Sequence, residues 1–182
     1  MIEVIKSYPL ATIISIKNNE PLITHLPLVY NESDNLIGHI DKYNPQTALL
    51  NNNAPITVIF SGPQSYISPS IFKTPQLPTW NYIKVHLQGT VNAIESKDAL
   101  KQSLINMTEF LEAPEHKYIL KEDNSSMEGY LDYIRMFEIN ISNWEGKFKL
   151  SQNKTKKDFE IARQELIATN KKDIGDFLEK LI

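Results

Sequence analysis

Hydrogen-bond donors are concentrated in one short stretch of the sequence, EGKFKLSQN (residues 145–153). Lys147 and Lys149 alternate with apolar residues, and Gln152 and Asn153 follow in a polar turn. Ammonium and amide groups arranged in this way are suited to holding an anion, because each can donate hydrogen bonds to its oxygens. The residues leave open the alternative that this stretch is only a solvated connector between a strand and a helix.

A second place for an anion is the segment that starts at Asn44. Asn44 suits the N-cap of a helix over residues 44–52, and Pro45 suits its first helical position. The free N–H groups at a helix start attract phosphate. His39 precedes this start and Gln46 lies within its first turn. The simpler explanation is that Asn44 only caps the helix.

Aromatic and hydroxyl-bearing side chains form a third group, in the proline-rich segment 63–79 and the strand that follows it. These residues are Tyr66, Ser68, Ser70, Trp80, Asn81 and Tyr82. Such side chains could form the wall of a site for a planar ring. They could equally plug one end of a barrel or lie in a dimer interface. The residues alone do not separate these alternatives.

Several kinds of chemistry are excluded or disfavoured by the composition. The chain has no cysteine, so thiol catalysis, disulfides and cysteine-ligated zinc are ruled out. Its four histidines show no i, i+4 pairing, and no nucleotide-binding or serine-hydrolase motif is present. A net charge of −3 disfavours a general nucleic-acid surface. No residue is identified as catalytic, and no metal site is expected.

The elements that must position these groups are mostly short strands. We expect strands at 11–16, 21–30, 36–41, 55–62, 80–96 and 133–142, and helices near 44–52, 97–112 and 156–180. Residues 63–79 are expected to form an ordered loop. A chain of 182 residues suggests one domain. The pattern predicts a mainly β (α+β) fold, a small barrel with peripheral helices. The apolar stretches are too short to span a membrane, and a cytoplasmic protein is expected.

Five segments together resemble the PaiB family of FMN-binding split-barrel proteins, first described as negative transcriptional regulators. They are THLPL (24–28), GHIDKYNPQ (38–46), FSGPQSYISPS (60–70), PTWNYIKVHLQGTV (78–91) and EGKFKLSQN (145–153). The resemblance covers about residues 8–165. It implies a split β-barrel similar to that of pyridoxamine-phosphate oxidases, in a homodimer with FMN between the subunits. Residues 1–154 would form the barrel domain, and a C-terminal helix in 155–182 would pack on the same domain.

The resemblance also implies roles for individual residues. By position, Thr24, His25, Leu26 and Pro27 fall where split barrels lay strand backbone along the flavin ring. His39, Asn44 and Gln46 fall where the oxidase relatives bind the phosphate. No Lys or Arg follows Asn44, so Lys147 or Lys149 is expected to supply the positive charge. The further cofactor-binding candidates are Ser68, Trp80, Asn81, Gln152 and Asn153.

Two functions follow as expectations. The first is an FMN-binding protein with a regulatory output, direct or indirect, as the family's name suggests. The second is an FMN-dependent oxidoreductase acting on a small molecule, as the wider superfamily implies. Direct DNA binding is disfavoured, because no helix-turn-helix pattern is evident. A homodimer is also expected because segment 63–79 is rich in apolar side chains, among them Ile67 and Leu77.

Overall fold

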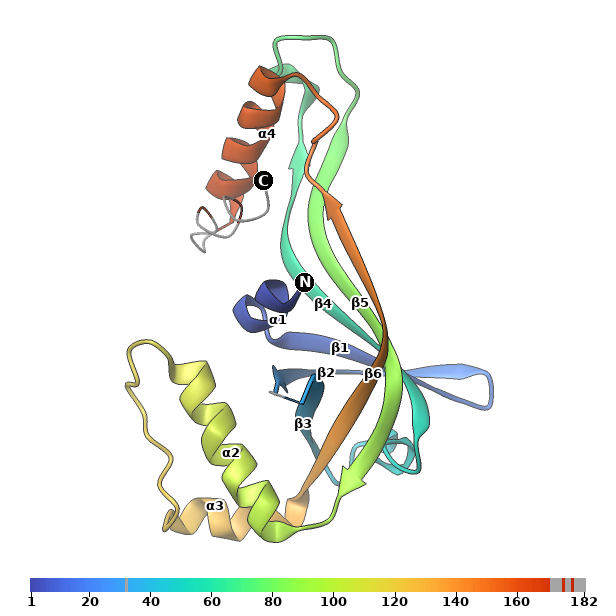
Figure 1. Cartoon of the computed structure of the whole chain (residues 1–182), viewed down its shortest axis with the longest axis vertical. Helices are drawn as coiled ribbons and strands as arrows, with labels where there is room; N and C mark the ends of the chain where they lie inside the picture. The colour runs from blue at the N-terminus through green and yellow to red at the C-terminus, as the bar shows by residue number, and fades with distance from the viewer. Residues whose placement is uncertain (32, 171–174, 176–177, 179–182) are drawn as a thin grey trace. The chain divides into compact units, whose positions relative to one another are not determined.

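The computed structural model describes residues 1–182 except 32, 171–174, 176–177 and 179–182. Six strands form a closed barrel in the order β1-β2-β3-β6-β5-β4 (Figure 1). The strands are β1 (Leu10–Lys17), β2 (Glu20–Tyr30), β3 (Asn35–Asp41), β4 (Ala54–Ile67), β5 (Thr79–Ile94) and β6 (Ile134–Lys149). The helices are α1 (Ile2–Ser7), α2 (Lys97–Glu112), α3 (Ser125–Tyr130) and α4 (Lys156–Thr169), with 3₁₀ turns η1 (Pro45–Leu49), η2 (Pro69–Ile71) and η3 (Leu131–Tyr133). The predicted mainly β barrel with peripheral helices is confirmed.

The chain divides into two compact units, which are described separately. Unit 1 comprises residues 1–8, 60–86 and 145–182, and unit 2 comprises residues 9–59 and 87–144. Strands β4, β5 and β6 each contribute residues to both units. The predicted division at residue 154 stays a prediction; α4, which follows that position, belongs to unit 1.

Unit 2 is built on an antiparallel meander of β1, β2 and β3. Asn18 and Asn19, both with positive φ, form the two-residue turn between Lys17 and its partner Glu20. Such a turn matches the twist of the strands that it joins, and Asn tolerates the left-handed conformation. One face of each strand packs inward, so that Ile13, Leu28 and similar side chains are fully buried. Their removal from water is the main force that holds the meander together.

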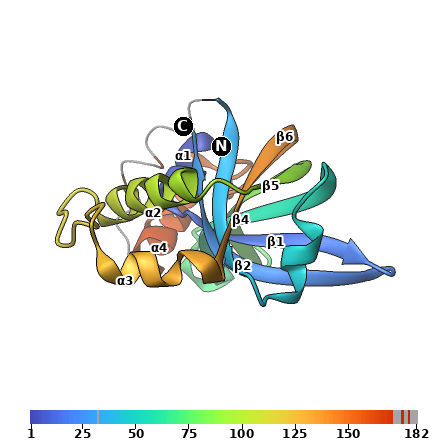
Figure 2. The same cartoon turned by 90° about the horizontal axis from the view of Figure 1, so that it is seen from below.

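Helices α2 and α3 of unit 2 run alongside each other (Figures 1 and 2). Ser96 caps α2 by accepting a hydrogen bond from the Ala99 N–H. A buried cluster joins the two helices to the beginning of β6. Its members are Leu100, Met127, Leu131 and Met136.

Unit 1 contains residues 60–67 of β4, 79–86 of β5 and 145–149 of β6, with α4 beside them (Figure 1). Thr155 caps α4 by accepting a hydrogen bond from the Asp158 N–H. The Asp158 side chain is fully buried and accepts hydrogen bonds from the backbone N–H of Lys73 and the hydroxyl of Thr74. The segment before β5 is therefore fastened to the first turn of α4.

Four expectations about the elements need correction. Strand β4 continues through Ile67, so the predicted loop over 63–79 begins later. Strand β6 continues to Lys149, because residues 145–149 keep a period-two pattern despite their charge. The predicted helix over 44–52 is the five-residue turn η1. Helix α4 ends at Thr169, where the Asn170 amide donates back to the Leu166 carbonyl; most of the predicted continuation to residue 180 lies outside the described residues.

Helices α1 and α3 were not expected from the sequence, because each is only six residues long. Within the described residues, no helix is long and apolar enough to cross a membrane.

Candidate functional site

The turn at Asn44 in unit 2 is organised by its own side chains. Asn44 Oδ1 accepts a hydrogen bond from the Gln46 N–H at 2.9 Å, and Asn44 Nδ2 donates to Thr24 Oγ1 at 3.2 Å. The predicted N-cap role is therefore confirmed. A five-residue 3₁₀ turn contributes little helix dipole, so an anion at this turn needs a side-chain cation.

Gln46 anchors the turn to the barrel interior rather than pointing at solvent. Its buried amide donates to Ser15 Oγ at 3.0 Å and to the Ile13 carbonyl at 3.4 Å. Its Oε1 atom has no hydrogen-bond partner within the described part of the chain. Both amide hydrogens are therefore used in fixing β1 against the turn.

His39 carries no positive charge near neutral pH. Its ring is largely buried, and this burial lowers the pKa of the imidazole to about 4. Nε2 shares a hydrogen bond with Ser103 Oγ at 3.0 Å, which connects β3 to α2. A neutral imidazole at this position cannot neutralise a phosphate.

Lys42 is the cation that the sequence analysis missed beside this turn. Its ammonium lies 4.2 Å from the centroid of the Tyr133 ring and 5.0 Å from that of Tyr43. It makes no salt bridge among the described residues; Asp132, whose pKa it helps to lower, is bonded to Lys97 at 2.6 Å. In the sequence Lys42 stands two residues before Asn44, whereas the sequence expectation considered only a Lys or Arg after Asn44.

The hairpin of β1 and β2 exposes an aliphatic face. Thr12 and His25 are cross-strand partners on this face and share a hydrogen bond of 2.9 Å. Around them, large aliphatic side chains are exposed: Leu10 63 %, Ile16 62 % and Ile23 55 %. Leu26 is buried in the barrel, and Pro27, the partner of Leu10, is half-buried. An exposed aliphatic row of this kind is typical of a surface that is covered by a ligand ring or a partner subunit.

In unit 1, aromatic and cationic side chains share one face of the strands. Trp80 is 54 % exposed, and its ring lies 6.3 Å from that of Tyr66 on β4. Lys84 Nζ donates to Ser61 Oγ at 2.8 Å, and burial lowers the pKa of Lys84. Trp80 and Lys84 lie four residues apart on β5 and so point to the same side.

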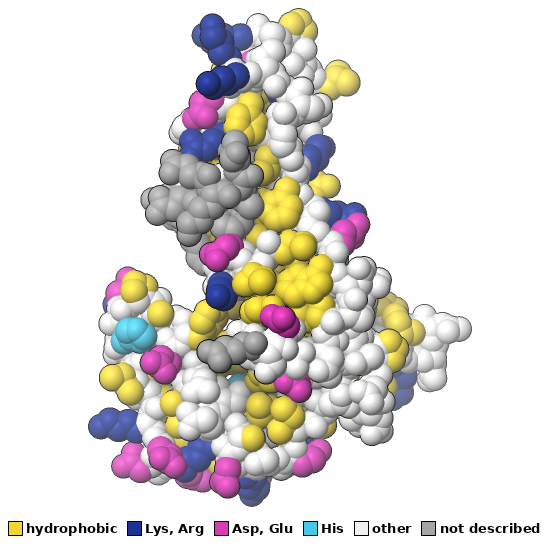
Figure 3. Space-filling model, viewed as in Figure 1, with side chains coloured by type: hydrophobic (Ala, Val, Ile, Leu, Met, Phe, Trp, Pro, Cys, Tyr) yellow, Lys and Arg dark blue, Asp and Glu magenta, His cyan; other side chains and the backbone are white. Residues whose placement is uncertain are grey.

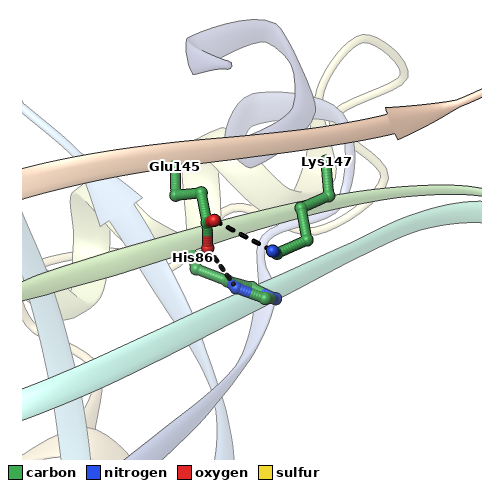
Figure 4. Close-up of polar contacts among 3 residues, drawn as sticks. All are labelled: His86, Glu145 and Lys147. Atoms are coloured by element: carbon green, nitrogen blue, oxygen red, sulfur yellow. Dashed lines mark hydrogen bonds and ion pairs between the residues drawn. The ribbon is translucent and has the colours of Figure 1, made fainter.

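His86, Glu145 and Lys147 form a hydrogen-bonded group on this same face (Figure 4). His86 Nδ1 lies 3.0 Å from Glu145 Oε2, and Lys147 Nζ lies 2.9 Å from Glu145 Oε1. The hydrogen bonds from Lys147 and then His86 lower the pKa of Glu145, and Glu145 raises the pKa of Lys147. The sequence could not identify this group, because His86 and Glu145 are 59 residues apart.

The turn after β6 is partly structural. Gln152 Oε1 accepts from the Leu150 N–H at 2.8 Å, and Gln152 Nε2 donates to the Phe148 carbonyl. Ser151 has a positive φ of 66° and donates to Oδ1 of buried Asn81 at 3.0 Å. Gln152 and Asn81 therefore shape the turn, whereas Lys149 and Asn153 border an open groove.

Ser68 is likewise a capping residue. Its hydroxyl accepts from the Ser70 N–H at 3.3 Å and lies 2.7 Å from the Ser70 hydroxyl.

The predicted site residues thus fall into two groups. Unit 2 contains Thr24, His25, Leu26, Pro27, His39, Asn44 and Gln46, and unit 1 contains Ser68, Trp80, Asn81, Lys147, Lys149, Gln152 and Asn153. The unit 1 group offers hydrogen-bond donors, cations and exposed apolar area, and the unit 2 group offers the same once Lys42 and the exposed face of β1 and β2 are added to it. These are the groups that a flavin phosphate and ring require, so the residues present fit FMN.

Comparison with known proteins identifies the family. Residues 1–143 match the family described as "Putative FMN-binding domain". The chain is 33 % identical over 153 residues to the Bacillus subtilis "Protease synthase and sporulation protein PAI 2", which covers 81 % of this chain and 73 % of that protein.

Two solved structures show the fold. A FAD and heme binding protein from Mycobacterium smegmatis has a TM-score of 0.65 at 20 % identity, covering 88 % of this chain and 75 % of its own. A Listeria innocua protein described as "Putative Pyridoxamine 5'-phosphate oxidase" has a TM-score of 0.52 at 11 % identity. The match covers 80 % of this chain and 93 % of the Listeria innocua chain. The predicted split barrel is confirmed. The chain therefore belongs to the PaiB family of FMN-binding proteins, and its cofactor is FMN.

Proposed function

We propose that FMN is anchored in unit 2 by its phosphate, at the turn that Asn44 begins, and that Lys42 supplies the positive charge. The observation that carries this proposal is the position of Lys42, two residues before the turn and without a salt bridge among the described residues. A phosphate monoester carries nearly two negative charges, so a neighbouring ammonium contributes charge-assisted hydrogen bonds. The carboxylate of neighbouring Asp41 already accepts from the Tyr43 N–H at 2.7 Å.

The proposal differs from the sequence expectation in its choice of lysine. Lys147 is bonded to Glu145, so moving its ammonium to a phosphate would leave that carboxylate without its main partner. Lys149 borders a separate groove of unit 1. Lys42 lies beside the turn, and moving its ammonium to a phosphate would break only its contacts with the rings of Tyr43 and Tyr133.

Titration with two flavins tests the choice. Lys42→Ala should weaken FMN binding by about 1–3 kcal/mol, roughly 5- to 150-fold, as expected for a lost bond to a charged group. Riboflavin, which lacks the phosphate, should bind the variant and the parent equally. Lys42→Arg, which keeps the charge, and Lys17→Ala, at the last residue of β1, serve as controls. A selective loss of FMN affinity in Lys147→Ala or Lys149→Ala instead would restore the sequence expectation and contradict the role of Lys42.

The cellular role that we propose is regulatory, in a homodimer. The support is the family itself and the name of the Bacillus subtilis relative, which refers to protease synthesis and sporulation. The exposed aliphatic face of β1 and β2 supports the dimer.

Regulation by this protein would act through the flavin or through a partner protein rather than by tight contact with DNA. The net charge is −3, and acidic side chains are interspersed with basic ones on the face drawn in Figure 3. A net negative charge weakens the salt-dependent attraction to the DNA backbone. Gel-shift titration against the DNA upstream of its own gene should detect no nanomolar binding at physiological salt. Binding at that level would overturn the indirect role.

An FMN-dependent oxidoreductase is the second candidate, favoured by the group of His86, Glu145 and Lys147. FMN, when bound, supplies the hydride and electron chemistry. Glu145 bonds to Nδ1 of the His86 ring and so orients its Nε2, a nitrogen that can serve as a hydrogen-bond donor or acceptor. Anaerobic titration with reduced nicotinamide cofactors, followed by visible absorption, tests this candidate. Bleaching that slows in His86→Gln would support it, and no bleaching with either cofactor would favour the regulatory role alone.

A further inference from the structure

A groove in unit 1 lies between the segment before β5 and the turn after β6. Its volume is about 520 Å³, which is within the usual range for small-molecule sites. Its lining is Pro75, Gln76, Leu77, Pro78, Thr79, Lys149, Ser151, Gln152, Asn153 and Lys154. None of these residues is acidic, although the chain as a whole is net negative.

The two lysines of the groove differ in how far their charges are compensated. Among the described residues, no carboxylate forms a salt bridge with Lys149. Lys154 donates to Gln76 Oε1 and lies 4.8 Å from the centre of the Phe72 ring, and its charge also helps to lower the pKa of Asp158. Asp158 is itself occupied by the Lys73 N–H and the Thr74 hydroxyl. The groove therefore keeps a net positive charge, most of it at Lys149.

Hydrogen bonds hold both walls of the groove in place. The Gln152 side chain accepts from the Leu150 N–H and donates to the Phe148 carbonyl, and the Ser151 hydroxyl donates to buried Asn81. On the opposite wall, the hydrogen bonds of Asp158 to residues 73 and 74 fix the start of the segment that carries Pro75, Leu77 and Pro78. Leu77 is 82 % exposed, so this wall presents apolar area to whatever enters.

We propose that this groove binds a small organic anion with a phosphate or carboxylate headgroup and a short apolar or aromatic body. The headgroup would bind to Lys149 and Lys154, and the body would contact Pro75, Leu77 and Pro78. This site is distinct from the phosphate position at Lys42 in unit 2. The two proposals can therefore fail independently.

Three probes of similar size separate the contributions. Phenyl phosphate, benzoate and benzyl alcohol carry two, one and no negative charges on the same ring. Each is titrated into the FMN-loaded protein by calorimetry, while flavin fluorescence reports any release of FMN. We expect phenyl phosphate or benzoate to bind with a submillimolar to millimolar Kd that weakens as salt is added, and benzyl alcohol not to bind measurably.

Variants connect the binding to the groove. Lys149→Gln should lower the affinity of the protein for the anionic probe at least fivefold. The double variant with Lys154→Gln should show no measurable binding of that probe. Lys156→Gln, exposed on the first turn of α4 and outside the groove, removes one charge and should leave the affinity unchanged.

Three outcomes would overturn the proposal. Equal binding of all three probes would mean that the charge plays no part. Equal losses of affinity for the anionic probe in Lys149→Gln and Lys156→Gln would mean that the probe responds only to the general surface charge and not to the groove. Release of FMN by phenyl phosphate from the parent protein but not from Lys149→Gln would identify the groove with the FMN phosphate site, which would also contradict the proposed role of Lys42. Selective loss in Lys149→Gln without FMN release would support the groove, whatever the result for Lys42.

Discussion

Asp158 is the residue on which the local structure of unit 1 most depends. It is a fully buried carboxylate that joins α4 to residues 73 and 74. The hydrogen bond from Thr74 is the largest cause that lowers its pKa below the ordinary 3.8, and the Lys73 N–H adds to it. A carboxyl group with a depressed folded-state pKa stabilises the fold above its unfolded pKa, and this stabilisation is lost as the pH falls through the folded pKa.

Asp158→Asn should therefore lower the resistance of the protein to urea at pH 7, because a neutral amide cannot accept the same two bonds as strongly. The difference between the variant and the parent should shrink as the pH is lowered below about 3.8. Urea unfolding followed by tryptophan fluorescence between pH 3 and pH 7 measures both effects. Glu165→Gln, an equal change of charge on α4, is the control. A difference that is constant across this pH range would show that the ionised carboxyl group is not the cause.

At the scale of the element, close contact between β5 and β6 depends on Gly89. A Cβ atom placed there would lie 2.3 Å from the backbone oxygen of Asn140, far inside van der Waals contact. The backbones of the two strands therefore approach closely at this glycine. Because the obstacle is backbone, the two strands would have to separate.

Gly89→Ala should destabilise the protein by about 1–3 kcal/mol, the usual cost of overpacking. The matched control is Gly129→Ala in α3, where a Cβ meets nothing within 4 Å. That change should be stabilising by roughly 0.5–1 kcal/mol, because alanine is the better helix former. Denaturant midpoints of the two variants should thus move in opposite directions. An unchanged midpoint for Gly89→Ala would contradict the close approach.

Much of the element pattern could be predicted because local signals were unambiguous. The Asn18-Asn19 turn and the caps at Ser96 and Thr155 use nearby side chains and backbone, so the sequence contains the whole interaction. The contact of His86 with Glu145, and that of Asp158 with Thr74, join residues far apart in the chain. No periodicity reports such pairs. The alternation in residues 145–149 was visible, but its charges suggested hydrogen-bond donors for an anion, or a solvated connector, instead of a strand.

At the scale of the whole molecule, the exposed aliphatic face of β1 and β2 predicts how copies associate. Ile23 lies in this row, opposite Ile14 on β1. If a second copy covers the row, an ammonium at position 23 would be buried in the interface at a high cost in free energy. Ile23→Lys should convert the proposed dimer to a monomer at micromolar concentration in sedimentation velocity. Ile119→Lys makes the same change at a residue that is 70 % exposed outside this face, and it should leave the dimer intact. A parent protein that sediments as a monomer would exclude the dimer altogether.

The division into two units has a consequence for synthesis on the ribosome. The chain passes between the units at Tyr8–Pro9, Ile59–Phe60, His86–Leu87 and Trp144–Glu145. Unit 2 is complete in sequence once Trp144 has emerged, whereas unit 1 still lacks Glu145, Lys147 and the whole of α4. Since domains fold during translation as their residues become available, the barrel meander can form first. The residues of unit 1 that are already translated, including those of β4 and β5, cannot complete their packing until residues 145–182 have been translated.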